Sequence, residues 1–305
     1  PPLKSTVLIG VPACLTTYTV CKTPRPVASE PLISADPPIP VISTWWALNV
    51  APPATITQPG KYCLAKDTTI NMKAGVGIDI ASSDVTLDCD GRLLKNTTTV
   101  ATGTSIGIQS NNRSNVVIKN CRVVGGWMNG IDMYQDNTKP NANYYNQILD
   151  NYVAGPLWHG IRAYGSAIEI KNNKVYDIGG KYNQYAIGIR VGGSSVGFKL
   201  HVVTDNIVVG TNSPYSAAYG IFSDGSIGSA FLNNGIAGTT PAGGKAAHGG
   251  VGAGQHNRIS DNHITGVGAP TEWSISTTDV TTSCFDNYLR AMNGTVHCQA
   301  ELGNY

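Results

Sequence analysis

Hydrophobic residues recur along this chain in short alternating runs, separated by glycine, asparagine and other turn-forming residues. Val116-Val117-Ile118, Ala167-Ile168-Glu169-Ile170 and His201-Val202-Val203 are such runs. Alternation over a few residues between turn residues is typical of β-strands. A helix would need apolar positions three and four apart over about ten residues, and no segment has that spacing. The pattern therefore predicts an all-β protein.

Two sequence markers repeat with one loose period, and the steps of the first are 23 to 32 residues. The first is a glycine followed by isoleucine or valine, at Gly77-Ile78, Gly107-Ile108, Gly130-Ile131, Gly160-Ile161, Gly188-Ile189, Gly220-Ile221 and Gly250-Val251. The second is an asparagine, a variable residue and then an aliphatic residue, with one extra residue in the first case. It occurs at Asn120-Cys121-Arg122-Val123, Asn151-Tyr152-Val153, Asn173-Lys174-Val175, Asn206-Ile207-Val208, Asn234-Gly235-Ile236, Asn262-His263-Ile264 and Asn287-Tyr288-Leu289.

A unit of this length holds three short strands, which predicts one coil of a solenoid stacked about 4.8 Å from the next. The repeated asparagines are expected to stack and to hydrogen-bond the backbone of neighbouring coils. The repeated isoleucine and valine are expected to stack inside, and the glycine suits a bend between sheets.

Residues 55–290 resemble the right-handed parallel β-helix proteins of the pectate-lyase-like superfamily. The segments that look like opening coils of such bacterial proteins are Ile56-Thr57-Gln58-Pro59-Gly60-Lys61-Tyr62-Cys63-Leu64 and Val85-Thr86-Leu87-Asp88-Cys89-Asp90-Gly91. The resemblance implies a right-handed parallel β-helix of about 7–9 coils. The superfamily includes polysaccharide lyases, hydrolases, epimerases, tailspikes, adhesins and structural subunits, so the fold alone does not give the function.

Three regions are expected around this solenoid. Residues 1–54 hold many of the 17 prolines and predict an extended Pro-rich N-terminal arm. Residues 55–290 are the β-helix, within which the Gly- and Ala-rich residues 237–256 are expected to form a loop. Residues 291–305 are expected to be a disulfide-closed C-terminal cap that covers the last open sheet edge.

Composition narrows the functional classes. Charged residues make up 13% of the chain and the net charge is +2, which leaves no electrostatic footprint for nucleic acid. No apolar run reaches about 18 residues, so no membrane span is expected.

The seven cysteines form no Cys-x-x-Cys pair. Cys14 with Cys21 and Cys284 with Cys298 close short loops, which predicts disulfides and a secreted or extracellular protein. Cys63 and Cys89 are expected to pair one coil apart, leaving Cys121 buried as a thiol.

Alternation also predicts which side chains face outward. If each isoleucine of a Gly-Ile pair points inward, the residue after it points out. That outward column contains Asp79, Gln109, Asp132, Arg162, Arg190 and Phe222, and the column two residues later contains Ala81, Asn111, Tyr134, Tyr164, Gly192 and Asp224. The middle coils thus gather a patch made of Asp132, Tyr134, Trp158, His159, Arg162, Tyr164 and Arg190.

This patch has a plausible chemistry on polysaccharide. Arg162 and Arg190 would hold the carboxylate of an acidic sugar, and Tyr164 or His159 would remove the neighbouring proton in a β-elimination. Asp132 or Tyr134 would assist, and Trp158 would stack on a sugar ring. The alternative is an ordinary surface on which Asp132 and Arg162 form an ion pair across two coils.

Part of the patch is also similar to polygalacturonases. Residues 158–166 look like their glycine-histidine-glycine strand, and Asn129-Gly130-Ile131-Asp132 looks like their first catalytic strand. The carboxylate expected before Gly130 is Asn129, and the paired-aspartate strand is missing, so hydrolysis by two carboxylates is not expected. His248, His256 and His263 match no metal-ligand spacing, and we expect neither metal nor cofactor.

The sequence therefore supports two functional hypotheses. The first is a secreted β-helix protein that binds polysaccharide on its lateral face and cleaves it by a lyase-like reaction. The second is a non-catalytic extracellular subunit of a filament, sheath or spike, which self-associates through the N-terminal arm and the solenoid ends.

Overall fold

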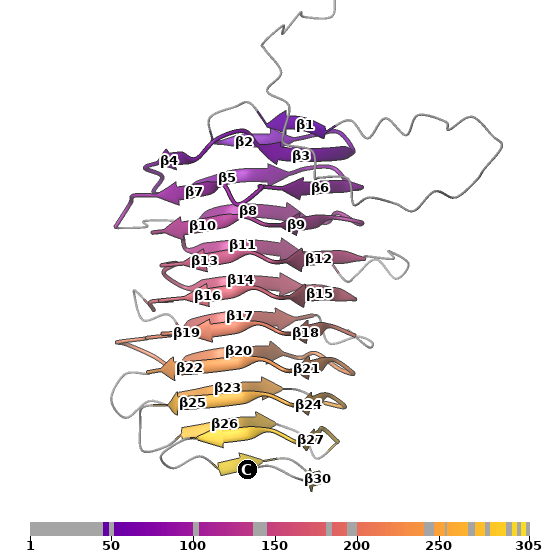
Figure 1. Cartoon of the computed structure of the whole chain (residues 1–305), viewed down its shortest axis with the longest axis vertical. Helices are drawn as coiled ribbons and strands as arrows, with labels where there is room; N and C mark the ends of the chain where they lie inside the picture. The colour runs from indigo at the N-terminus through magenta and orange to yellow at the C-terminus, as the bar shows by residue number, and fades with distance from the viewer. Residues whose placement is uncertain are drawn as a thin grey trace, which may run out of the picture.

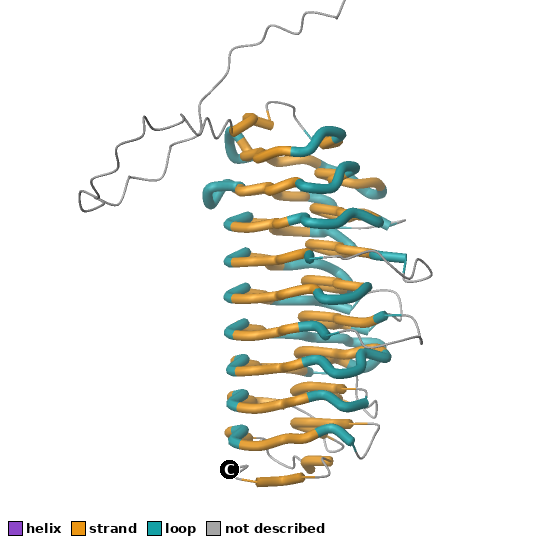
Figure 2. The backbone as a smooth tube through the Cα atoms, turned by 90° about the vertical axis from the view of Figure 1, so that its right-hand side faces the viewer, coloured by secondary structure: helices purple, strands orange, loops and turns teal. Residues whose placement is uncertain are grey.

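The chain folds as a right-handed parallel β-helix, as the sequence predicted. A computed structural model describes residues 45–48, 52–99, 104–136, 145–180, 185–193, 200–240, 247–253, 255–267, 272–277, 281–290, 295–297 and 300–302. Figure 1 shows the coils stacked along one long axis, and Figure 2 shows strands joined by loops in every coil. The described part of the chain contains no helix that could cross a membrane.

Each coil contributes one strand to each of three parallel sheets, which we call A, B and C. Sheet A contains β1 (Trp45–Leu48), β3 (Gly60–Leu64), β6 (Val85–Asp88), β9 (Val117–Lys119), β12 (Asn146–Leu149), β15 (Ile168–Lys171), β18 (Val202–Thr204), β21 (Ala230–Leu232), β24 (Arg258–Ser260), β27 (Ser283–Phe285) and β30 (Ala300–Leu302). Sheet B contains β2 (Ala54–Ile56), β5 (Gly75–Ile80), β8 (Ser105–Asn111), β11 (Asn129–Tyr134), β14 (His159–Tyr164), β17 (Ala186–Gly192), β20 (Ala218–Asp224), β23 (Ala247–Ala253), β26 (Glu272–Thr277) and β29 (Thr295–His297). Sheet C contains β4 (Thr68–Ile70), β7 (Leu93–Asn96), β10 (Arg122–Gly125), β13 (Tyr152–Ala154), β16 (Lys174–Tyr176), β19 (Ile207–Val209), β22 (Gly235–Thr239), β25 (His263–Val267) and β28 (Tyr288–Arg290).

Two strands lie where the sequence predicted other structure. β1 pairs with β3, so Trp45–Leu48, which we had placed in the arm, extends sheet A. β23 occupies part of the expected loop 237–256, because Val251 takes the register position after Ile221 and continues the stack. Most of the predicted arm, residues 1–44, and parts of the predicted cap lie outside the described residues.

The core is a set of aliphatic ladders, as the repeat predicted. Ile108, Ile131, Ile161 and Ile189 are register partners in successive strands of sheet B, and all four are fully buried. The glycine before each isoleucine is needed for close approach. A Cβ atom on Gly160 would lie 2.4 Å from Val175 Cγ1 and 2.6 Å from the carbonyl oxygen of Gly188.

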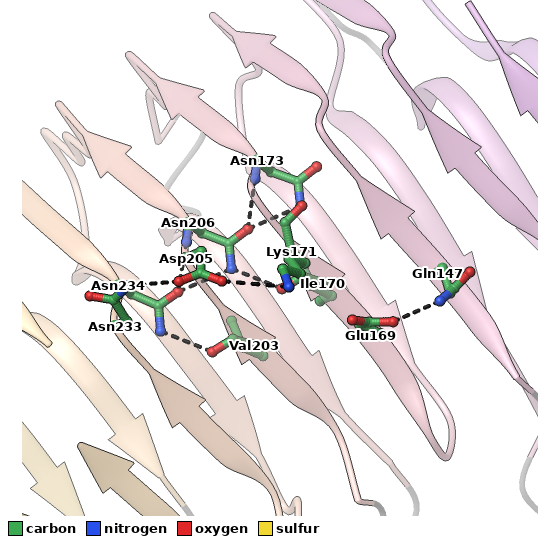
Figure 3. Close-up of polar contacts among 10 residues, drawn as sticks. All are labelled: Gln147, Glu169, Ile170, Lys171, Asn173, Val203, Asp205, Asn206, Asn233 and Asn234. Carbon is green, nitrogen blue, oxygen red and sulfur yellow. Dashed lines mark hydrogen bonds and ion pairs between the residues drawn. The ribbon is translucent and has the colours of Figure 1, made fainter. Parts of the chain in front are cut away.

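A ladder of buried asparagines runs along the turn between sheets A and C, and Figure 3 shows three of its members. Its members are Asn151, Asn173, Asn206, Asn234, Asn262 and Asn287. Each of the first five donates its side-chain amide to the next asparagine's oxygen, and each of the six donates to a backbone carbonyl one coil back. The predicted asparagine stack is therefore confirmed.

The residue before each asparagine of this ladder adopts a left-handed backbone conformation. These residues are Asp150, Asn172, Asp205, Asn233, Asp261 and Asp286, with φ between 51° and 59°. Asp and Asn tolerate this region better than other residues with a side chain, so the turn selects them.

In the coil before Asn151, a disulfide-bonded cysteine occupies the position that the ladder asparagine has in later coils. Arg122 pairs in register with Tyr152, so Cys121, and not Asn120, occupies the position of Asn151. Cys121 is bonded to Cys89 one coil earlier, with the two Cα atoms 4.7 Å apart. The predicted Cys63–Cys89 pair and the predicted Cys121 thiol are therefore wrong. The reason is register: Cys63 lies opposite Asp88, one residue away from Cys89.

The remaining cysteines are only partly described. Cys63 and Cys284 are also disulfide-bonded. The two predicted short-loop pairs include Cys14, Cys21 and Cys298, which lie outside the described residues.

Candidate functional site

The outward face of sheet B brings together the residues that the sequence singled out. Asp132, Arg162 and Arg190 are register partners in β11, β14 and β17. Tyr134 and Tyr164 are partners two residues further along the same strands. The two columns that alternation predicted therefore lie side by side on adjacent coils.

A buried ion pair anchors this face. Arg162 donates from Nε to Asp132 Oδ1 at 2.9 Å, and its Nη2 lies 2.7 Å from Oδ2. The side chain of Asp132 is 0% exposed and that of Arg162 is 25% exposed. A buried carboxylate is tolerated only when it is paired, and the bidentate contact with Asp132 fixes the plane of the Arg162 guanidinium group.

A neutral histidine connects this pair to the second arginine. Because the Asn129 oxygen can only accept, His159 donates from Nδ1 to it at 2.9 Å, and its Nε2 accepts from Arg190 Nη1 at 3.4 Å. Asn129 in turn donates to Asp132 Oδ2 at 2.9 Å. Burial, followed by the charges of Arg190 and Arg162, holds the pKa of His159 well below its usual value. The imidazole is therefore neutral, and it is fully buried.

The second arginine is paired with a carboxylate from β20. Arg190 Nη2 lies 2.6 Å from Asp224 Oδ2, and the Tyr164 hydroxyl donates to the same oxygen. Burial and this hydrogen bond raise the pKa of Tyr164 to about 12. Burial alone would raise the pKa of Asp224, but hydrogen bonds from Tyr164 and Arg190 outweigh it and lower that pKa.

The sequence did not identify Asn129 or Asp224 as members of this site. Tyr164 reaches Asp224 over an intervening coil because Gly192, between them in the column, has no side chain. A Cβ atom there would lie 2.9 Å from Tyr164 Cζ and 2.8 Å from the Asp224 carbonyl oxygen. The glycine between Tyr164 and Asp224 in this column was the available signal in the sequence.

Aromatic rings line the same face in two groups. Tyr134 and Tyr164 stack with centroids 6.3 Å apart, and the Arg162 and Arg190 guanidinium carbons lie 5.9 and 5.3 Å from the Tyr164 ring centroid. Trp158, predicted to bind sugar, is half-buried with its ring 4.3 Å from that of His159.

The second aromatic group lies towards the C-terminal end of the face. Tyr219 and Phe222 have centroids 4.6 Å apart, and Tyr185 meets Tyr219 edge-on at 6.0 Å. Phe222 is the register partner of Arg190, which therefore lies between the two aromatic groups.

Asp132 pairs with Arg162 and Asp224 pairs with Arg190, which limits what these four groups can do chemically. Tyr164 donates its proton to Asp224, and His159 has no exposed surface from which to reach a ligand. No cluster of three or more His, Cys, Asp or Glu suited to a metal ion occurs in the described segments.

Comparison with known proteins gives only a weak structural likeness. No family model and no curated protein matches this chain. Among solved structures, the chain is similar to the A-module of the Azotobacter vinelandii mannuronan C-5 epimerase AlgE4. The identity is 11% and the TM-score is 0.36, over 83% of this chain and 88% of that one. A likeness at this level carries no functional conclusion.

Proposed function

We propose that this protein binds polysaccharide along the outward face of sheet B. The observation that carries the proposal is the stacked pair Tyr134–Tyr164, flanked by two guanidinium groups that carboxylates hold in place. A sugar ring offers an apolar face to an aromatic ring and hydroxyls to planar polar groups. Because both guanidinium groups are already held by carboxylates, the face needs little reorganisation to bind.

Binding fits this geometry better than cleavage. β-Elimination needs a base that can reach a sugar proton, and Tyr164, with a pKa of about 12, donates to Asp224. His159 is neutral and could accept a proton, but it is fully buried. Hydrolysis needs a carboxylic acid that stays protonated, whereas the pKa of Asp224 is lowered.

The Cys89–Cys121 disulfide supports an oxidising compartment, so we place the binding face outside the cell. The rival hypothesis of a self-assembling subunit depends on the arm, residues 1–54. Because residues 1–44 lie outside the described residues, that hypothesis stays a prediction.

The proposal is tested by affinity electrophoresis of the whole protein in gels that contain soluble polysaccharides, with Tyr134→Ala as the variant. Tyr134 is 39% exposed, so its loss should leave the fold intact and weaken binding about tenfold, a typical cost of losing an aromatic contact.

The matched control is Tyr176→Ala. Tyr176 also pairs with a tyrosine on the adjacent coil, Tyr152, with ring centroids 5.4 Å apart, but on sheet C. Equal loss of binding in both variants would contradict the proposal. So would a wild-type protein whose migration no polysaccharide slows. Release of unsaturated product that Arg162→Ala abolishes would restore the lyase hypothesis.

A further inference from the structure

The arrangement of charged side chains on sheet B bears on which class of polysaccharide this face can bind. Resting on the function proposed above, we infer that this face takes an uncharged polysaccharide, held mainly by its aromatic side chains, and rejects polyuronates. The inference differs from the acidic sugar that the arginines suggested from the sequence. It follows from three properties of the face: its charge balance, the occupancy of its guanidinium groups, and the distribution of its aromatic rings.

The face carries no excess of positive charge. The charged residues at the outward positions of β5, β8, β11, β14, β17 and β20 are Asp79, Asp132, Asp224, Arg162 and Arg190. These are three carboxylates and two guanidinium groups. Arg113, which follows β8, acts on the charge of Asp79 and balances the third carboxylate. An anionic polymer would therefore approach a surface without net positive charge, which gives it no long-range attraction.

Most hydrogen-bonding nitrogens of the two guanidinium groups are already occupied, and Arg190 Nε is buried without a partner. Arg162 uses Nε and Nη2 for the two oxygens of Asp132. Arg190 directs Nη2 to Asp224 and Nη1 to the imidazole of His159. A sugar carboxylate would have to displace a protein carboxylate, and for Arg162 it would leave the fully buried Asp132 without its partner.

The aromatic rings, by contrast, have exposed surface along the solenoid axis. Tyr134 is 39% and Tyr185 is 47% exposed, and Tyr164, Tyr219 and Phe222 are half-buried. From β11 to β20 the rings span three coil steps, which is about 14 Å at the usual strand spacing. Successive sugar rings of one chain can stack on such a strip, and stacking does not require that the sugar carries a charge.

The test compares polymers that share a backbone and differ in whether their substituents carry a charge. Polygalacturonate and its fully methyl-esterified form make one pair, and carboxymethyl cellulose and hydroxyethyl cellulose make another. Binding of the whole protein to each is measured by isothermal titration calorimetry at about 0.01 M and about 1 M salt, where the Debye length is about 30 Å and about 3 Å. We expect binding to an uncharged member, with affinity that changes less than about twofold with salt.

Asp224→Asn provides a gain of function. It leaves Arg190 without its carboxylate, so the variant should acquire affinity for the charged polymers that falls at least about tenfold between the two salt concentrations. The matched control is Asp205→Asn, which changes the net charge equally but lies beside Lys171 at the edge of sheet A.

The outcomes separate the two proposals. Preference of the wild-type protein for the charged polymers, lost at high salt, would overturn the inference and leave polysaccharide binding intact. Binding to no member of either pair would contradict the proposed function itself. If Asp224→Asn and Asp205→Asn behaved alike, the assignment of Asp224 as the neutralising carboxylate would be wrong.

Discussion

The asparagine ladder makes a sharp prediction about stability, which centres on Asn206. Its side chain is fully buried and makes four hydrogen bonds. Its oxygen accepts from the backbone and side-chain nitrogens of Asn173 at 2.9 and 3.0 Å. Its amide donates to the Ile170 carbonyl at 2.9 Å and to Asn234 at 3.0 Å (Figure 3). Asn206→Ala removes all four bonds at once.

The magnitude follows from the groups left without partners. A buried donor or acceptor that loses its partner costs about 1–3 kcal/mol, and neighbouring losses do not add fully. We therefore expect Asn206→Ala to lower the free energy of unfolding by about 4 kcal/mol. For a chain of this size that corresponds to a fall in Tm of about 6 °C.

The matched control is Asn233→Gly. Asn233 has one exposed hydrogen bond, to Asp205 at 2.7 Å, and its φ of 51° suits glycine. We expect this variant to lose less than about 1 kcal/mol. Thermal melting gives the global effect, and hydrogen exchange at the Asn173 amide gives the local one, because solenoids can open coil by coil. Equal destabilisation by the two variants would refute the ladder as a source of stability.

Three further predictions concern the core, the disulfide and the candidate site. Gly160→Ala should destabilise the protein by about 1–3 kcal/mol in urea denaturation, because its Cβ has no room, whereas Gly179→Ala, with nothing within 4 Å of the new atom, should be nearly neutral. Replacing both Cys89 and Cys121 by serine should cost about 3–4 kcal/mol through the lost crosslink over 32 residues, and an unchanged urea midpoint would argue against the bond. The phenol of Tyr164 should titrate near pH 12 in ultraviolet absorbance, and Asp224→Asn should lower that pKa towards 10.0. Since its pKa is higher in the folded state, Tyr164 contributes stability that is complete below pH 10 and is lost as pH rises towards 12. Comparing the melting temperatures of wild type and Tyr164→Phe over this pH range measures that loss.

Most features of a single coil, and the register between coils, can be predicted from the sequence. Each repeat carries its own glycine, isoleucine and asparagine, and adjacent coils are forced into register because a slip of one residue would turn the buried face outward. That is why the outward columns, the isoleucine stack and the asparagine ladder could be predicted from spacing alone. The disulfide could not, because turn lengths differ between coils: four residues lie between Asp88 and Leu93, whereas two lie between Lys119 and Arg122.

The chemistry of the candidate site required the folded structure. The sequence placed Arg162, Arg190 and Tyr164 on one face and gave the Asp132–Arg162 ion pair only as the alternative interpretation, which the structure shows. It did not show that Asp224 neutralises Arg190. Tyr164 and Asp224 are 60 residues apart, and they meet because Gly192 leaves space between them.

Local repetition therefore determined the fold and the direction in which each side chain points. Only tertiary structure decided which charges remain available to a ligand and which residues are covered. The physical reason is that strand alternation is a property of neighbouring residues, whereas ion pairing and burial depend on how side chains from several coils fill one shared space.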